Sequence, residues 1–244
     1  MILCLVIGLS LSAAAIQASE SVQIATADGR TVECSVCLPV GTSRVPCLVA
    51  APGRGYHKDL AIFTDLAGKA AASGFAVFTF NWHYFSAGED PSEGLIREIE
   101  DMKAVVQYAR SHPRVDRTHI VVGGKSLGSA IAAQVFAADD SLAALILMTP
   151  VMLNEKAATQ NYPGLLAEKR PTLVVLGEGD RDACPLRVLY TTLATAARDI
   201  PVVVVGGDHG LNIGSPENLA TASNIAVANA AIVHWLRLWT SAAQ

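Results

Sequence analysis

Short runs of apolar and β-branched residues recur along the chain at the spacing expected for strands that alternate with helices. Several runs are apolar throughout, such as LILM at 145–148 and VVVV at 202–205. Strands without polar alternation are typical of a parallel sheet that helices cover on both faces. The pattern predicts eight strands, over residues 22–26, 31–38, 47–51, 76–81, 119–122, 144–149, 172–176 and 202–205.

The first two predicted strands are joined by a short segment with Asp28 and Gly29 at its centre. An Asp-Gly pair between two strand patterns is typical of a tight hairpin, which pairs its strands antiparallel. We therefore expect a mostly parallel eight-stranded sheet with an antiparallel N-terminal edge.

Stripes of apolar residues at helical spacing fill several gaps between the strands. The clearest stripes run over residues 60–70, 95–106 and 219–239. Gly74 is the expected stop of the first helix, and Ser92 and Ser215 are the expected N-caps of the other two. Because strands and helices alternate without a linker, the sequence predicts one α/β domain over residues 19–244, with helices on both faces of the sheet.

The first residues of the chain form a separate apolar segment. Residues 2–16 carry no charge, and Glu20 is the first charged residue. A run of this length is shorter than the ~20 residues of a membrane span, and it ends in small residues, as signal peptides do. The pattern predicts a signal peptide over residues 1–18, cleaved after Ala15 or Ala18, and a secreted or periplasmic protein without stable membrane association after cleavage. No Lys or Arg precedes the run, which leaves an uncleaved anchor, a misassigned start or a buried helix as alternatives.

Composition excludes several classes of protein. Hydrophobic residues make up 51% of the chain and charged residues 16%, which excludes a disordered protein. The 18 basic and 22 acidic residues give a net charge of −4 without a basic run, so we expect no nucleic-acid partner.

Four cysteines follow the expected cleavage site: Cys34, Cys37, Cys47 and Cys184. An even number in an exported protein permits disulfides. Cys34 and Cys37 stand too far apart along one extended strand to bridge each other. No second CxxC or HxxxH motif is present to complete a zinc site. We therefore expect these cysteines to be mostly small core residues, and we expect no metal site.

The strongest candidate for chemistry is the segment 124–128, which reads GKSLG and matches the pattern G-x-S-x-G. A predicted strand precedes it and an alanine-rich helix follows, which is the context of a nucleophile elbow. Ser126 would project from the helix N-terminus, where developing negative charge is favoured. The sequence predicts Ser126 as a nucleophile, with a helix N-cap serine in a glycine-rich loop as the alternative.

Two further predicted strand ends supply an acid and a base. The seventh strand is followed by Asp180 and Asp182, of which Asp180 is the favoured partner of a histidine and Asp182 the rival. His209 follows the last strand in a glycine-rich loop and is the expected general base. Functional groups in open α/β sheets gather beyond the carboxyl ends of the strands. We therefore expect Ser126, Asp180 and His209 to meet.

The loops after two earlier strands are expected to complete the site. The segment 52–55 reads PGRG and can offer the N–H of Arg54 to an oxyanion, and Leu127 can supply a second N–H. Trp82, His83 and Tyr84 follow the fourth strand and are expected to form a wall of the substrate pocket. Ordinary packing beneath a loop is the alternative for these aromatic residues.

The order of serine, acid and histidine along the chain is that of the α/β-hydrolase fold. On the segments GKSLG, PTLVVLGEGD, GGDHG and APGRG, the chain resembles this superfamily over residues 22–240. Within it, the chain resembles small lidless members, namely dienelactone-hydrolase-like proteins and a testis-expressed-protein-like group. That group likewise has a basic residue before the serine, here Lys125, but usually has His-Gly where this chain has Pro52 and Gly53.

The resemblance implies a serine hydrolase that cleaves an ester, thioester or similar acyl bond through an acyl-enzyme, without a metal or organic cofactor. Only residues 151–171 separate the sixth and seventh strands, where lids usually enter this fold, so no cap domain is expected. An open site suits a small-molecule or polymer-attached acyl substrate. The alternatives are a catalytically silent binding module and a peptidase.

Overall fold

A computed structural model of the protein describes residues 17–242. Within them, eight strands form one sheet in the order β1-β2-β4-β3-β5-β6-β7-β8. The strands are β1 (Glu20–Ala25), β2 (Thr31–Cys37), β3 (Val45–Ala51), β4 (Ala76–Phe80), β5 (Val115–Lys125), β6 (Ala144–Met148), β7 (Thr172–Gly177) and β8 (Val202–Val205). β2 pairs antiparallel with both β1 and β4, and all other neighbours pair parallel. This confirms the predicted sheet and its antiparallel edge.

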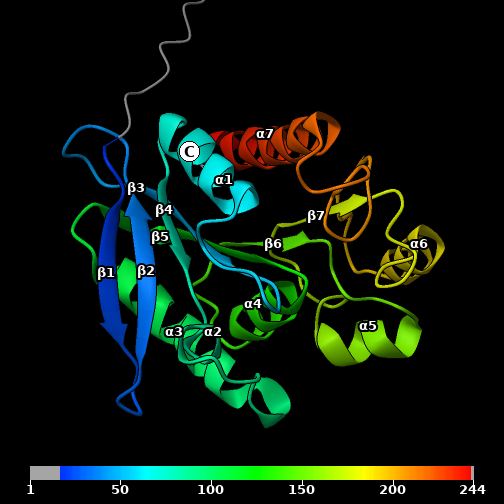
Figure 1. Cartoon of the computed structure of the whole chain (residues 1–244), viewed down its shortest axis with the longest axis horizontal. Coiled ribbons are helices and arrows are strands. Elements are labelled where there is room, and N and C mark those ends of the chain that lie inside the picture. Colours follow the sequence, from blue (N-terminus) through cyan, green and yellow to red (C-terminus); the bar gives the residue numbers. More distant parts are fainter. Residues whose placement is uncertain (1–16, 243–244) are drawn as a thin grey trace, which may run out of the picture.

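Helices cover both faces of the sheet (Figure 1). They are α1 (Ala61–Ala72), α2 (His83–Ala87), α3 (Ile96–Ser111), α4 (Leu127–Ala137), α5 (Glu155–Asn161), α6 (Leu186–Leu193) and α7 (Leu219–Ala242), with a 3₁₀ turn, η1 (Glu93–Leu95), before α3. α1 and α7 lie on one face, and α3 and α4 lie on the other.

The two apolar layers explain the unbroken hydrophobic runs in the sequence. Successive side chains of a strand point to opposite faces. In β3, Leu48 and Ala50 pack into the layer of α1 and α7, whereas Val49 and Ala51 pack into the layer of α3 and α4. Both faces of a central strand are therefore buried, and polar alternation is absent.

The start of α3 differs from the prediction. The helix begins at Ile96 and not at Ser92, because Gly94 and Leu95 adopt positive φ angles of 65° and 58° and interrupt the helical path. Ser92 still serves the helix, since its Oγ accepts the N–H of Arg97 at 3.0 Å.

The start of α7 is also later than the predicted N-cap at Ser215. It begins at Leu219, and the hydroxyl of Thr221 in its first turn accepts the N–H of Ile213, in the preceding loop, at 2.8 Å. By length and composition, α7 is the one helix in residues 17–242 that could cross a membrane. Part of its apolar surface is buried against α1 and the sheet, whereas Leu219, Val227 and Leu238 are exposed. The buried apolar residues of the helix are Ala228, Ile232, Val233 and Leu236.

The four cysteines in the described part of the chain are free and buried, as expected for core residues. Burial raises the pKa of the Cys34 and Cys184 thiols to about 12, so both remain protonated at neutral pH. The predicted signal peptide over residues 1–18 falls almost wholly on residues 1–16, which lie outside the described residues. The signal and the boundary at residue 19 stay predictions.

The connection between β6 and β7 contains one short helix, α5, and irregular chain. This matches the expectation that the segment between the sixth and seventh strands is too short for a cap domain. The carboxyl ends of β5, β6 and β7 are therefore left without a separate covering domain in residues 17–242.

Candidate active site

The three residues predicted to meet come together at the carboxyl edge of the sheet. Ser126, Asp180 and His209 follow β5, β7 and β8, which run parallel. His209 Nε2 lies 2.8 Å from Ser126 Oγ, and His209 Nδ1 lies 2.7 Å from Asp180 Oδ2. An ionised carboxylate can only accept, so Nδ1 carries the hydrogen and Nε2 accepts from the serine hydroxyl.

Ser126 stands at a strained turn between β5 and α4. Its φ and ψ are 52° and −117°. Residues other than glycine rarely adopt this backbone conformation, and tight packing around them must enforce it. A Cβ on Gly124 would lie 2.4 Å from the backbone of Gly128, and a Cβ on Gly128 would lie 2.5 Å from the carbonyl oxygens of Ala51 and Pro52. The two glycines of GKSLG are therefore required by close backbone approach.

The two candidate carboxylates have different environments. The Asp180 side chain has no exposed surface, and its Oδ1 accepts the N–H groups of Ala183 at 3.2 Å and Cys184 at 3.3 Å. Asp182 is exposed to solvent. The structure thus brings Asp180 to His209 and leaves Asp182 exposed at the surface.

Packing between two loops brings Asp180 to His209. Gly177 ends β7 so close to the next loop that a Cβ there would lie 2.4 Å from the carbonyl oxygen of Gly207. The N–H of Gly179 donates to the same oxygen at 2.8 Å. Asn224 on α7 donates from its amide to the carbonyls of Gly206 and Leu211, which anchors the histidine loop from the other side.

The loop after β3 lies directly against the serine. A Cβ on Gly53 would lie 3.4 Å from the Ser126 Cβ. The N–H groups of Arg54 and Leu127, predicted to bind an oxyanion, have no hydrogen-bond acceptor within residues 17–242. The Arg54 side chain is exposed and pairs with Asp90 at 3.0 Å. The side chain of Arg54 is therefore paired with Asp90, and the oxyanion prediction concerns its main-chain N–H alone.

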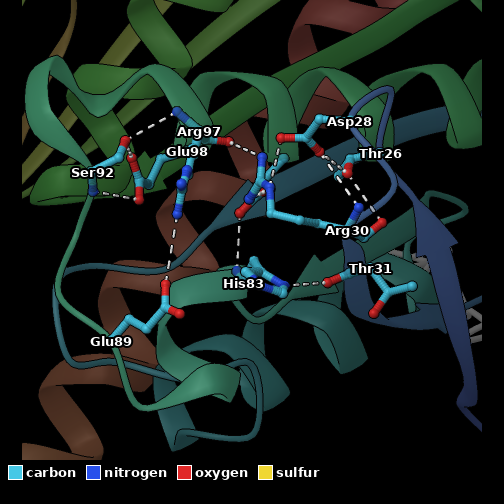
Figure 2. A network of polar contacts seen from close by, with 10 residues as sticks. Thr26, Asp28, Arg30, Thr31, His83, Glu89, Ser92, Arg97 and Glu98 are labelled. Carbon is cyan, nitrogen blue, oxygen red and sulfur yellow. Dashed lines mark hydrogen bonds and ion pairs between the residues drawn. The ribbon is translucent and has the colours of Figure 1, made fainter.

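Trp82, His83 and Tyr84 are placed as packing residues in the structure. Trp82 has no exposed surface, and its Nε1 donates to the Pro52 carbonyl at 2.9 Å, so it supports the loop that carries Arg54. Tyr84 is also buried. Figure 2 shows the His83 ring directed at the Thr31 carbonyl, 3.1 Å from Nδ1. These contacts correspond to the alternative interpretation, in which the three residues pack beneath a loop. Direct contact of these residues with a substrate stays a prediction.

The structure contains a polar network beside α2 that the sequence pattern does not predict. Arg30, from the β1–β2 hairpin, binds Asp28 at 2.8 Å (Figure 2). It also binds the buried Asp101 of α3 at 2.7 Å. Asp101 also accepts the N–H of His83 at 2.9 Å. Burial raises the pKa of Asp101 against the opposing effects of the His83 N–H and Arg30. The network ties the β1–β2 hairpin, α2 and α3 together.

A second chain of hydrogen bonds reaches the elbow from the β6–β7 connection. The N–H of Val151 donates to the Tyr162 hydroxyl at 2.7 Å, and that hydroxyl lies 2.8 Å from Ser129 Oγ. Ser129 Oγ donates to the carbonyl of Ser126 at 2.6 Å. Because Ser129 uses its hydrogen on Ser126, Tyr162 must donate to Ser129. The buried Tyr162 hydroxyl thus both accepts a hydrogen bond and donates one.

Replacing Tyr162 with phenylalanine is expected to lower the free energy of unfolding by about 1–3 kcal/mol, because a buried donor and a buried acceptor lose their partner. Urea denaturation followed by circular dichroism measures the change. Tyr190→Phe is the matched control, since Tyr190 on α6 is half exposed and its hydroxyl makes no hydrogen bond in the described structure. Equal stability of the two variants would contradict the assigned role of the Tyr162 hydroxyl.

The strand order and the edge at which these residues gather define an α/β-hydrolase fold. Residues 44–237 match the model of the alpha/beta hydrolase domain family, and the chain belongs to that family. This membership supports a hydrolase.

Other proteins are similar to this chain in sequence or in fold. The chain is 33% identical over 128 residues to the quorum-quenching protein AidA of Acinetobacter baumannii, across 50% of this chain and 42% of that protein. The match therefore spans less than half of the relative's length. Solved structures with the same fold include the esterase domain of a Rhodothermus marinus protein, with a TM-score of 0.69 and 15% identity over 91% of this chain and 98% of that one. A second is an alpha-beta serine hydrolase homologue from Coxiella burnetii, with a TM-score of 0.68 and 19% identity over 89% of this chain and 95% of that one.

Proposed function

We propose that this protein is a serine hydrolase that cleaves an ester, thioester or similar acyl bond. The observation that carries the proposal is the continuous hydrogen-bonded chain from the buried Asp180 through His209 to Ser126 at the strained elbow. Nucleophile, base and orienting acid stand in the order and at the distances that nucleophilic catalysis requires.

In the first half of the proposed reaction, His209 Nε2 takes the proton of Ser126 as the serine oxygen attacks the carbonyl carbon of the substrate. The carbonyl electron pair moves onto oxygen, and the N–H groups of Arg54 and Leu127 stabilise that oxyanion. The imidazolium then gives its proton to the leaving alcohol or thiol as the bond to the acyl carbon breaks. The acyl group remains on Ser126.

In the second half, water replaces the leaving group. His209 accepts a proton from water, the hydroxide attacks the acyl carbon, and Ser126 leaves with the proton returned by the imidazolium. Asp180 keeps the hydrogen on Nδ1 and stabilises the imidazolium in both halves. The enzyme ends in its starting state, and the products are an acid and an alcohol or thiol.

The short β6–β7 connection favours a substrate that reaches the site without a covering domain. We therefore propose a small-molecule or polymer-attached acyl group as the substrate class. Export of the protein stays a prediction from the sequence, because residues 1–16, which carry most of the expected signal, lie outside the described residues.

Labelling with a fluorophosphonate probe tests the proposal, because such probes form a covalent bond with an activated serine. The native protein is expected to be labelled, and Ser126→Ala is expected to remain unlabelled. Ser43→Ala is the matched control, since Ser43 is exposed and its hydroxyl makes no hydrogen bond in the structure as described. A folded native protein that resists the probe would indicate a binding module and overturn the proposed activity.

A further inference from the structure

Lys125 is buried beside the candidate active site. It is the last residue of β5, directly before Ser126, and 1% of its surface is exposed. Its Nζ donates to the main-chain carbonyl of His209 at 2.9 Å. The same Nζ lies 4.5 Å from the ring centre of Tyr56, which belongs to the loop after β3.

The ammonium group therefore touches two of the four loops that form the site, those after β3 and β8, and its own main chain continues into the loop after β5. Tyr56 is tied to the loop after β3 by its N–H, which donates to the Gly53 carbonyl at 3.1 Å. His209 carries the imidazole that meets Ser126. One side chain thus braces the oxyanion loop and the histidine loop against the strand that presents the serine.

Burial of this charge is costly unless polar partners compensate for it. The compensation comes from a carbonyl dipole and from the face of an aromatic ring, which attracts cations. Asp180 and Asp208 attract the ammonium through space, but within the described residues neither carboxylate forms an ion pair with it. An apolar residue would fill this position at a smaller desolvation cost, so a structural role alone does not account for an ammonium group here.

We infer that Lys125 is a positioning residue, whose ammonium group holds the main chain of His209 in the place from which the imidazole reaches Ser126. This inference rests on the proposed hydrolase activity. Lys125 itself does not touch the reacting atoms, and it acts through the carbonyl of His209.

The charge of this group changes within an accessible pH range. Burial lowers the pKa of Lys125 from 10.5 to about 8, against the attraction of Asp180 and Asp208. Among the groups that face it, Asp208 stays ionised, because the N–H groups of Asn212 and Gly210 outweigh its burial and lower its pKa. Burial raises the pKa of Tyr56, which stays neutral. Above pH 8 the amine loses its attraction to the Tyr56 ring and becomes a weaker donor to His209.

Lys125→Met tests the inference, since methionine keeps an unbranched apolar stem and removes the charge. We expect kcat for p-nitrophenyl acetate to fall by about 10²-fold, the typical cost of a misplaced catalytic group, with KM nearly unchanged. The wild-type rate should decline above about pH 8, and this alkaline decline should be absent in the variant. Lys103→Met is the control, because Lys103 is exposed on α3 and its one ion pair among residues 17–242 is with Glu100. Wild-type kcat with an unchanged alkaline decline in Lys125→Met would overturn the inference.

A second measurement uses the unmodified chain and does not depend on activity or on folding of the variant. In protein labelled with ¹³C at lysine Cε, one lysine signal is expected to titrate near pH 8, and the ring signals of His209 should shift with the same midpoint. His209 ring signals that do not respond when the Lys125 amine titrates would overturn the inference. The lysine and His209 signals could behave as expected in a protein that fluorophosphonate does not label. In that case the contact between Lys125 and His209 would stand, and the proposed hydrolase activity would be wrong.

Discussion

Ser126→Ala is expected to lower kcat for p-nitrophenyl acetate by about 10⁶-fold, the typical loss when the nucleophile of a serine hydrolase is removed. The reason is the geometry at the elbow, where the serine hydroxyl is the group that meets His209 Nε2, at 2.8 Å. The main-chain conformation of residue 126 is imposed by backbone packing around Gly124 and Gly128, so alanine should occupy it without unfolding the domain. Stopped-flow and steady-state assays give the rate, and circular dichroism gives the fold.

A double variant separates a nucleophile–base unit from two independent residues. His209→Ala alone and Ser126→Ala/His209→Ala should both lose about as much activity as Ser126→Ala, since members of such a unit are strongly non-additive. Losses that multiply would mean that the residues act separately. Full activity in Ser126→Ala would remove the serine from the proposed mechanism.

The sheet could be predicted because its signal is local. The run at 202–205 matches β8 at both ends, and the Asp28–Gly29 pair correctly indicated the hairpin. β5 was predicted only over 119–122, because its N-terminal part includes polar residues; in the structure it extends back to Val115, which pairs with Val45. That extension depends on a neighbouring strand far away in the sequence.

The residues of the candidate site could be predicted where each one directly follows a predicted strand. Ser126 and His209 each stand at a strand end with glycines beside them, which is a pattern of a few neighbouring residues. The choice between Asp180 and Asp182 needed the structure, because the close packing of Gly177 on Gly207 determines which carboxylate reaches the histidine.

The supporting contacts could not be predicted for the same reason. The bond from Lys125 to His209 joins residues 84 positions apart, and the bond between Tyr162 and Ser129 joins residues 33 positions apart. Neither pair has a periodic or motif signal. A carboxylate beside the apolar stripe of a predicted helix, as at Asp101, is a signal that could have indicated a buried ionic contact. The sequence thus predicts the residues of the candidate triad, whereas supporting residues such as Lys125 and Tyr162 are identified from the structure.

Asp180→Asn is expected to lower kcat by about 10⁴-fold, the typical cost of the wrong histidine tautomer in a serine hydrolase. In the structure, Asp180 Oδ1 accepts the N–H groups of Ala183 and Cys184, and Oδ2 faces His209 Nδ1. An asparagine that keeps its oxygen on those two N–H groups must present its NH₂ to the histidine. Nδ1 then becomes the acceptor, the hydrogen moves to Nε2, and the imidazole can no longer accept the proton of Ser126.

Asp182→Asn is the matched control for this prediction, because it makes the same chemical change two positions along the chain, at an exposed carboxylate. Its kcat should stay within about twofold of the native value, since an exposed side chain without a catalytic contact contributes little. The two variants are compared with p-nitrophenyl acetate at pH 7.5 and by the rate of fluorophosphonate labelling. A larger loss in Asp182→Asn would transfer the role to that residue. Small and equal losses in both would mean that no carboxylate orients His209, and the hydrogen-bonded chain would then have to act through the serine and the histidine alone.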